Sequence, residues 1–355
     1  MTKLMKGVFF PGSMTCTVED VEVPTPGMGE VLLEMRASGM CGSDLEYIYK
    51  VPKEKRGQPI LGVATDPSTI TGHEPAGVVT AVGPGVRHLK VGDRVAVYHI
   101  NGCGFCKDCR SGWHITCTEV HETYGFDRHG GNAQFMVADE RDCVILPNNV
   151  SFDAGAFVAC GAGTGFSVTR RLGISGMDDY LIFGAGPVGL SAAMFGKHMG
   201  ARVMVVDMNE TRLDMARALG VARTINPAKQ DVRDEVLSFT NGVGASAAVD
   251  CSANPRARSM MFDCVKTWGR AAFVGEGHDV HLDVSPQIIH RQITLIGSWV
   301  YSTPMMMELL ETISRHGLPL GELLVSDRFS LKDAPKAFER FAAGETAGKC
   351  VFVDF

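Results

Sequence analysis

The feature that most constrains this chain is a short apolar run, residues 180–183, that leads directly into a glycine-rich turn. Apolar residues at helical spacing follow the turn, and Gly200 is placed to end that helix. The turn has the Gly-x-Gly-x-x-Gly spacing, and its residues are Gly184, Ala185, Gly186, Pro187, Val188 and Gly189. The sequence therefore predicts a strand, a tight turn and a helix that begins with a proline.

This strand–turn–helix unit predicts a dinucleotide site. The first two glycines let the backbone approach a pyrophosphate at a helix N-terminus, and the third lets the helix pack on the strand. Asp207 closes the next apolar run, residues 202–206, about 20 residues further on, where an acid binds the ribose hydroxyls. Because this carboxylate would repel a 2′-phosphate, NAD is favoured over NADP.

Length and composition limit the classes of protein that this chain can belong to. Its 355 residues are enough for two domains. A net charge of −6 and the lack of a basic stripe make nucleic acid an unexpected partner. Without an apolar run of about 18 residues or a signal-peptide pattern, no membrane association and a cytoplasmic location are expected. Eleven cysteines without a secretory signal favour metal binding over disulfides.

The pattern of elements divides the chain into two parts. The first 150 or so residues are rich in short β-branched segments, whereas residues 155–297 alternate between strands and helices. In the second part, strands are predicted at 180–183, 202–206, 223–226, 246–250, 271–275 and 293–297. The predicted class is α/β, with a β-rich domain formed by residues 1–154 and 298–355 and a doubly wound parallel sheet over residues 155–297.

Four cysteines with the spacing C-x2-C-x2-C-x7-C form a compact group: Cys103, Cys106, Cys109 and Cys117. Four thiolates this close together can surround one tetrahedral ion and leave no position open. The spacing therefore predicts a structural zinc site, to which we assign no chemistry.

A second set of potential ligands is dispersed along the chain: Cys41, His73, Glu74 and Cys160. Each of them alone is typical of an ordinary buried residue. Together with the glycine turn, the four-cysteine segment and residues 91–95, 130–131 and 347–350, they make the chain resemble the zinc-containing medium-chain dehydrogenase/reductase family, which includes alcohol, sorbitol and threonine dehydrogenases. The resemblance covers nearly the whole length. It implies a GroES-like catalytic domain, a Rossmann domain, NAD and two zinc ions per chain.

The resemblance also implies roles for single residues at a catalytic zinc ion. Cys41, His73 and Cys160 would hold this ion, and Glu74 would be a neighbouring carboxylate that binds it transiently or lies behind the ligands. Asp44 would fix the tautomer of His73. An alcohol gives up hydride readily only once its hydroxyl is ionised, and zinc lowers the pKa of a bound water from about 16 to about 7.

Further roles concern the proton and the cofactor. Ser43 would take the proton of the substrate, Thr164 would contact the nicotinamide, and Arg212 would lie near the adenosine ribose. Many members of the family place a histidine three residues after the relay hydroxyl, where this chain has Glu46. Glu46 therefore either carries the proton to solvent, contacts the substrate, or is an ordinary surface carboxylate.

The substrate itself is less constrained. The resemblance places His99, Trp299 and Tyr301 near the substrate pocket. Cys160 is similar to the cysteine of alcohol dehydrogenases, whereas His99 is more similar to threonine dehydrogenases, so these two residues disagree about the subfamily. Glu46, His99 and a lysine-bearing loop between Cys41 and His73 favour a pocket with polar contacts.

We therefore expect an NAD-dependent zinc alcohol dehydrogenase that oxidises a small alcohol, favouring a secondary alcohol of a polar or polyol-like molecule. The alternatives are a primary-alcohol/aldehyde dehydrogenase, a zinc-free reductase of the same fold, and a nucleotide-binding paralogue without turnover. Zinc-free reductases lack the zinc ligands Cys41, His73 and Cys160 that are present in this chain. The family also implies a homodimer or homotetramer.

Overall fold

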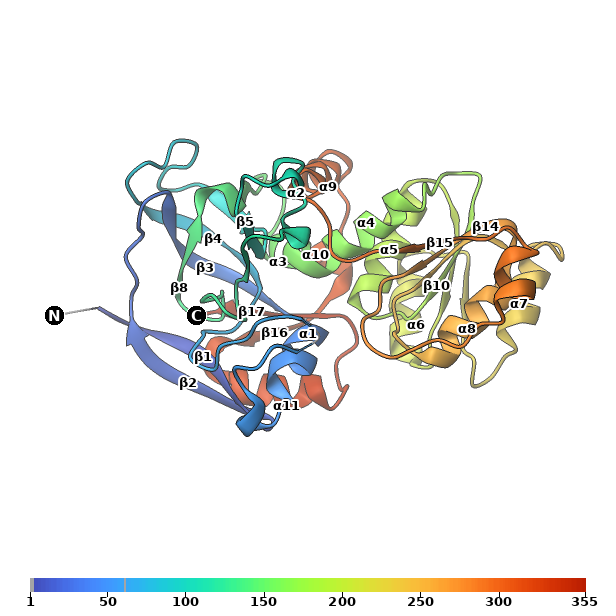
Figure 1. The fold of residues 1–355 in the computed structure, drawn as a ribbon, viewed down its shortest axis with the longest axis horizontal. Helices are drawn as coiled ribbons and strands as arrows, with labels where there is room; N and C mark the ends of the chain where they lie inside the picture. Colours follow the sequence, from blue (N-terminus) through green and yellow to red (C-terminus); the bar gives the residue numbers. More distant parts are fainter. Residues whose placement is uncertain (1–2, 61) are drawn as a thin grey trace. The chain divides into compact units, whose positions relative to one another are not determined.

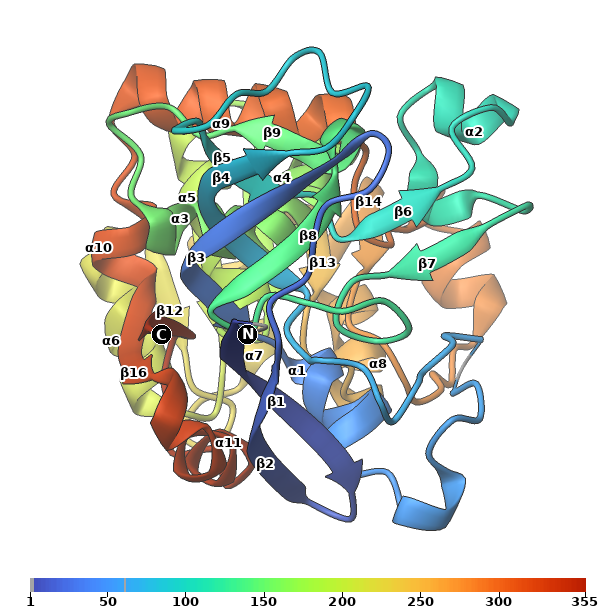
Figure 2. The ribbon, with the colours of Figure 1, turned by 90° about the vertical axis from the view of Figure 1, so that its left-hand side faces the viewer.

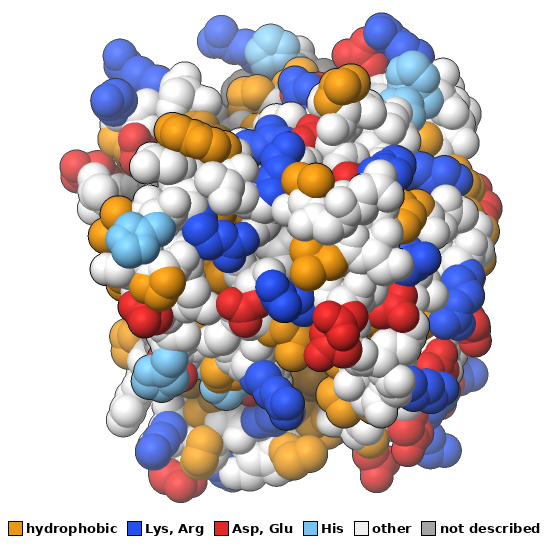
Figure 3. Space-filling model, turned by 90° about the vertical axis from the view of Figure 1, so that its right-hand side faces the viewer, with side chains coloured by type: hydrophobic (Ala, Val, Ile, Leu, Met, Phe, Trp, Pro, Cys, Tyr) orange, Lys and Arg blue, Asp and Glu red, His pale blue; other side chains and the backbone are white. Residues whose placement is uncertain are grey.

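The computed structural model describes residues 3–60 and 62–355, which form two compact units. Unit 1 comprises Met1–Gly163 and Tyr301–Phe355, and unit 2 comprises Thr164–Val300. Within the described residues, no helix has both the length and the apolar character needed to cross a bilayer. On the face drawn in Figure 3, acidic, basic and hydrophobic side chains are interspersed.

Unit 1 is built on a seven-stranded sheet of order β16-β17-β3-β4-β5-β9, in which β8 also pairs with β3 (Figure 2). Its strands are β3 (Glu30–Met40), β4 (Glu74–Val82), β5 (Arg94–Val97), β8 (Phe135–Asp139), β9 (Cys143–Ile145), β16 (Val325–Ser330) and β17 (Lys349–Asp354). Alternation places Val31, Leu33 and Met35 on one face of β3, where they are buried against Val79 and Met136. All strand pairs are antiparallel except β16 with β17.

Two small sheets and several helices complete unit 1. A hairpin is formed by β1 (Leu4–Gly12) and β2 (Thr15–Glu22). A cysteine lobe, residues 100–123, projects from the sheet in Figure 2 and contains β6 (Ile100–Gly102), α2 (Lys107–Arg110) and β7 (His121–Thr123). The helices are α1 (Gly42–Asp44), α3 (Phe152–Phe157), α9 (Thr303–His316), α10 (Leu320–Leu324) and α11 (Ala334–Ala342).

Unit 2 is a six-stranded parallel sheet of order β12-β11-β10-β13-β14-β15 with helices on both faces (Figure 1). The strands are β10 (Asp179–Phe183), β11 (Arg202–Val206), β12 (Arg223–Ile225), β13 (Ala245–Asp250), β14 (Val265–Phe273) and β15 (Thr294–Gly297). The helices are α4 (Gly163–Arg171), α5 (Pro187–His198), α6 (Glu210–Ala218), α7 (Val232–Phe239) and α8 (Pro255–Cys264). Helix α5 packs with α6, and α7 packs with α8.

The predicted class, a β-rich domain plus a doubly wound parallel sheet, is confirmed. Residues 155–163, which the sequence interpretation gives to the dinucleotide domain, lie in unit 1, where α3 packs on β3 and β4. Strand β14 begins at Val265 rather than at residue 271 and ends at Phe273. The pairing with β13 passes from Ala245 opposite Val265 to Ala247 opposite Arg270, and Trp268 between them has a φ of +61°, so residues 266–269 form an irregular stretch without the alternation of a regular strand.

Candidate metal centres and dinucleotide turn

Four potential metal ligands from distant parts of unit 1 converge in one place, which we call the ligand cluster: Cys41, His73, Glu74 and Cys160. The ligand atoms of all four lie within 4.8 Å of one another. Cys41 follows the end of β3 and His73 precedes β4, and the two strands pair with Gly39 opposite Glu74. Cys160 comes from a single π-helical turn, Val158–Ala162, that follows α3. The antiparallel register therefore brings the first three ligands together.

The two thiols of the ligand cluster interact directly. Their hydrogen bond is the largest influence on both groups, and it lowers the pKa of Cys41 well below its usual value and raises that of Cys160. Thiolate, imidazole and carboxylate donors at this spacing match the ligand set of zinc, with three protein ligands and room for one more.

His73 is held in one orientation by Asp44. The Nδ1 atom of His73 lies 2.8 Å from Oδ1 of Asp44, which is fully buried. The other carboxylate oxygen of Asp44 accepts a hydrogen bond from the backbone N–H of Cys41 at 2.8 Å. Burial lowers the pKa of His73, but Asp44 and Cys41 together outweigh burial and raise this pKa well above its usual value. Asp44 therefore directs Nε2 of His73 towards the cluster, where it lies 3.3 Å from Oγ of Ser43.

A lysine that the sequence interpretation did not identify lies behind the ligand cluster. Lys349, on β17, forms a hydrogen-bonded ion pair with Glu74, and both side chains are buried. The pair fits because Gly39 of β3 lies between the two strands; a Cβ atom on Gly39 would be 2.2 Å from Oε2 of Glu74. Burial raises the pKa of Glu74 to about 8 although Lys349 opposes this shift. The sequence signal was a lysine inside an otherwise apolar strand.

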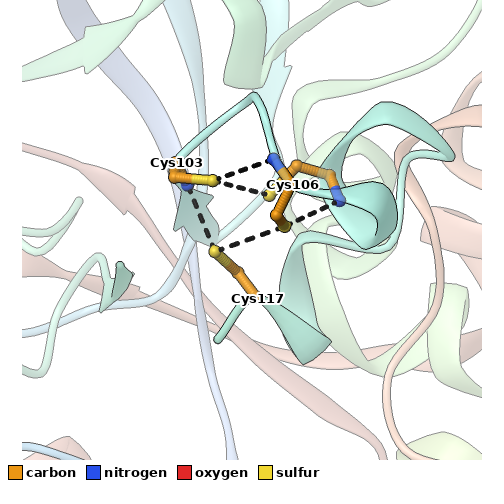
Figure 4. Close-up of side chains that lie close together, drawn as sticks. Cys103, Cys106 and Cys117 are labelled. Atoms are coloured by element: carbon orange, nitrogen blue, oxygen red, sulfur yellow. Dashed lines mark hydrogen bonds between the residues drawn. The ribbon is translucent and has the colours of Figure 1, made fainter. Parts of the chain in front are cut away.

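The four cysteines of the cysteine lobe also converge, with sulfur atoms within 4.8 Å of one another. Figure 4 shows Cys103, Cys106 and Cys117 of this group. The sulfurs of Cys103 and Cys109 are 3.9 Å apart and those of Cys106 and Cys117 are 3.8 Å apart, too far for a disulfide. Burial raises the pKa of Cys117, but backbone N–H donors outweigh burial and lower this pKa to about 6. Four thiols with such donors can hold one metal ion with no open position.

In unit 2, the glycine turn has the geometry that a dinucleotide requires. Gly184 has a φ of +95°, and a Cβ on Gly189 would be 1.8 Å from the carbonyl oxygen of Gly184. A Cβ on Gly186 would meet nothing within 4 Å, so the turn is open at that point. Gly186 is also the N-cap of α5, and no side chain of the described residues caps this helix end. An anion can therefore reach the N-terminus of α5 beside Pro187 and Val188.

Asp207 lies at the end of β11, next to the glycine turn. Its Oδ2 accepts a hydrogen bond from Ala185 N at 2.7 Å, and its Oδ1 accepts one from Asn209 N at 2.8 Å. Arg212 follows on α6, and its buried Nε has no hydrogen-bond partner among the described residues. Thr164 is the first residue of unit 2 and is buried.

The remaining predicted residues differ in their surroundings. Glu46 forms an exposed ion pair with Lys50, which lies one helical turn further on. Buried His99 has Nδ1 2.7 Å from the carbonyl oxygen of Ala159, and its ring centre is 5.3 Å from that of His73. Burial lowers the pKa of His99 to about 3, so its ring is neutral.

Trp299 and Tyr301, both predicted near the substrate, lie in different units. Trp299 is 45% exposed. Tyr301 is fully buried, and its hydroxyl donates to the carbonyl oxygen of Val158 at 2.7 Å.

Two protein-family models match the chain. Residues 187–315 match the family described as zinc-binding dehydrogenase, and residues 27–148 match the alcohol dehydrogenase GroES-like domain. An uncharacterised zinc-type alcohol dehydrogenase-like protein of Escherichia coli K12, YphC, is 40% identical over 351 residues, which is 98% of each chain. L-threonine 3-dehydrogenase of Marinomonas sp. (strain MWYL1) is 31% identical over 94% of each chain.

Solved structures agree with this relationship. Acetophenone reductase of Geotrichum candidum, solved in complex with NAD, has a TM-score of 0.84 and 26% identity, over 100% of this chain and 98% of that one. An NAD-dependent alcohol dehydrogenase has a TM-score of 0.85 and 27% identity, over 99% of this chain and 100% of that one. With both domain models matched in order and a 40% identical relative over almost the full length, this chain belongs to the zinc-dependent medium-chain dehydrogenase/reductase family of oxidoreductases.

Proposed function

We propose that this protein is an NAD-dependent alcohol dehydrogenase with two zinc sites, which moves hydride between NAD and a small secondary alcohol of polar or polyol-like character. The observation that carries the proposal is the convergence of Cys41, His73 and Cys160 around one point, with Asp44 and Ser43 at the imidazole. In unit 2 of the same chain, the open glycine turn and Asp207 fit a dinucleotide.

A zinc ion in the ligand cluster would acidify the hydroxyl of an alcohol, and the nicotinamide of NAD would accept the hydride. The chain's own residues orient the zinc ligands and take up the proton of the substrate. Asp44 keeps the proton of His73 on Nδ1, so that Nε2 is a ligand. Ser43, 3.3 Å from that nitrogen, is placed to accept the proton that the substrate releases. Glu46, three residues after Ser43, is exposed in an ion pair with Lys50, and we propose that it passes that proton on to solvent.

The preference for a polar substrate rests on His99. Because Nδ1 of this neutral histidine donates to the carbonyl oxygen of Ala159, its Nε2 carries a lone pair and can accept a hydrogen bond. A second hydroxyl or an ammonium group on the substrate would supply the donor. L-threonine 3-dehydrogenase, a 31% identical relative, is named for a secondary alcohol that carries such a group. A primary-alcohol dehydrogenase is the alternative, favoured by Cys160.

The test is a panel of secondary alcohols, diols, polyols, hydroxy acids and primary alcohols, with the absorbance of NADH as readout. We expect the highest kcat/KM for a secondary alcohol with a neighbouring polar group, and His99→Phe should reduce that kcat/KM more than the value for a plain secondary alcohol. A panel led by primary alcohols would favour the alternative. A protein that binds NADH but converts no alcohol or carbonyl compound would contradict the proposal.

We also propose that the protein forms a homodimer or homotetramer. β15 is an edge strand of the unit 2 sheet and three of its four residues are exposed, which leaves a backbone edge for pairing. Light scattering in solution measures the mass directly, and a monomer would refute this part.

A further inference from the structure

Three loops lie side by side at the carboxyl edge of the parallel sheet, where the first contacts the second and the second contacts the third. They follow β10, β13 and β14, and β10 and β13 are neighbours at the point where the strand order reverses. A Cβ on Gly184 would be 3.0 Å from Cβ of Ser252, and a Cβ on Gly275 would be 2.4 Å from the backbone N of Ala253. A crevice at such a reversal is where doubly wound sheets bind their ligands.

Asp250, the last residue of β13, connects two of these loops from a fully buried position. Its Oδ1 accepts hydrogen bonds from the backbone N–H and the hydroxyl of Ser252, at 2.9 and 2.6 Å. Its Oδ2 accepts one from Ala253 N at 3.2 Å. The backbone carbonyl of Asp250 accepts from Val274 N and Gly275 N, both at 3.0 Å. The ends of the second and third loops are thus fixed to one residue.

Arg258, on α8, holds the rest of the third loop. Its side chain is buried, and its Nε donates to Oδ2 of Asp250 at 2.9 Å. Its Nη1 donates to the carbonyl oxygens of Gly277 and His278 at 2.8 and 3.0 Å, and its Nη2 donates to that of Gly275. One guanidinium therefore joins a buried carboxylate to four carbonyl groups, those of Gly275, Gly277, His278 and Asp279, in the loop 275–279, of which residues 276–279 are exposed.

The conformation of this loop needs such support. His278 has a φ of +60°, which costs free energy in a residue other than glycine. The planar fork of an arginine can donate to several acceptors at fixed angles, whereas a lysine ammonium cannot reproduce this pattern. Arg258 therefore offsets the local cost and fixes the loop before a ligand arrives.

We propose that Arg258 is a positioning residue that pre-forms the loop 275–279 as the wall for the nicotinamide half of the dinucleotide, an inference that rests on the proposed function. Asp207 marks the adenosine side at β11, and the glycine turn after β10 takes the pyrophosphate. The other half must then lie on the side of β13 and β14, where this loop is. A loop already in its bound conformation loses less entropy on binding, which increases affinity.

The experiment compares two arginine-to-lysine variants of the intact protein by fluorescence titration with NADH. Arg258→Lys should raise the Kd for NADH by about tenfold and speed amide hydrogen exchange in residues 274–280, while zinc per chain stays unchanged. The matched control is Arg270→Lys, since Arg270 also bonds to carbonyl groups, those of Leu172 and Gly173, and to the carboxylate of Asp178, but at the opposite edge of the sheet. Its Kd should equal that of the wild type.

An unchanged Kd for Arg258→Lys, or an equal loss in both variants, would overturn the inference and leave the proposed function standing. A wild-type protein that does not bind NADH would overturn both. If Arg258→Lys does not fold, Gly275→Ala is the second variant, because its Cβ would push the third loop away from Ala253 and leave Arg258 intact. It should weaken NADH binding in the same way, and full affinity in this variant would refute the inference.

Discussion

At the scale of single residues, the buried pair of Glu74 and Lys349 places a positive charge directly behind the ligand cluster. Burial lowers the pKa of Lys349, but Glu74 together with Cys41 and Cys160 outweighs burial and raises this pKa to about 12. The lysine therefore stays charged and opposes the rise in the pKa of Glu74 that burial causes. Whether this carboxylate is available to a metal depends on that charge.

Replacing Lys349 by methionine should destabilise the protein, because a buried carboxylate would lose its partner. Breaking a buried ion pair from one side costs about 3–5 kcal/mol. Urea unfolding monitored by circular dichroism should show this loss, and zinc per chain should be measured alongside. Lys349→Arg keeps the charge and should retain most of the stability. A methionine variant as stable as the wild type would show that the pair contributes nothing to the fold.

Asp142, beside the cysteine lobe, should make the free energy of unfolding depend on pH. Its buried Oδ2 accepts hydrogen bonds from Asn101 at 2.6 Å and Tyr124 at 3.0 Å, yet burial raises the pKa of Asp142 to about 7. A raised carboxyl pKa favours the protonated folded state. Its stabilising contribution is therefore complete below the pKa of the unfolded chain, about 4, and is lost as the pH rises to about 7.

Asp142→Asn removes this titration and keeps an acceptor oxygen for both donors. The free energy of unfolding of the variant, minus that of the wild type, should therefore rise between pH 5 and pH 8 by an amount on the order of 1–3 kcal/mol. The difference between their Tm values should rise over the same pH range. Calorimetry at several pH values measures this difference, and effects shared by both proteins cancel in it. Parallel pH profiles for the two proteins would contradict the expectation.

At the scale of elements, the glycine turn contains one glycine that should matter for NADH binding alone and another that should also matter for stability. A Cβ on Gly186 meets no protein atom within 4 Å, so Gly186→Ala should leave the Tm unchanged but block the pyrophosphate and raise the Kd for NADH at least tenfold. A Cβ on Gly189 would overlap the carbonyl oxygen of Gly184, so Gly189→Ala should also lose about 1–3 kcal/mol of stability. Thermal unfolding and NADH titration of both variants test this. Equal losses of stability would show that the two positions are not distinct.

The same elements show which parts of the fold and of the site the sequence can predict. Motifs within a few residues, such as the glycine turn and the cysteines of residues 103–117, bring their groups together through local geometry, which spacing alone predicts. Lys349 and Glu74 are 275 residues apart, and a lysine in a strand is normally at the surface. Only the position of β17 between β16 and β3 buries it. The role of Arg258 cannot be predicted from the sequence either, because its acceptors include backbone carbonyl groups, whose positions the sequence does not reveal.

At the scale of the whole molecule, the two metal sites should differ in how readily they lose an ion. Both belong to unit 1, but the cysteine lobe offers four thiols, whereas the ligand cluster keeps a position for another ligand. A chelator such as dipicolinate should therefore remove one zinc per chain first and abolish activity while the fold remains. The second zinc should leave only together with unfolding. Atomic absorption and circular dichroism along a chelator series test this, and simultaneous loss of both ions would contradict it.

The place of β17 inside the unit 1 sheet has a consequence for biosynthesis. Translation runs from the N-terminus, so the segment with Glu74 leaves the ribosome long before residues 349–354 exist. Until that last strand inserts beside β3, Glu74 has no counter-charge and the sheet has a gap. The buried ion pair behind the ligand cluster can therefore form only after β17 has been synthesised and has paired with β3.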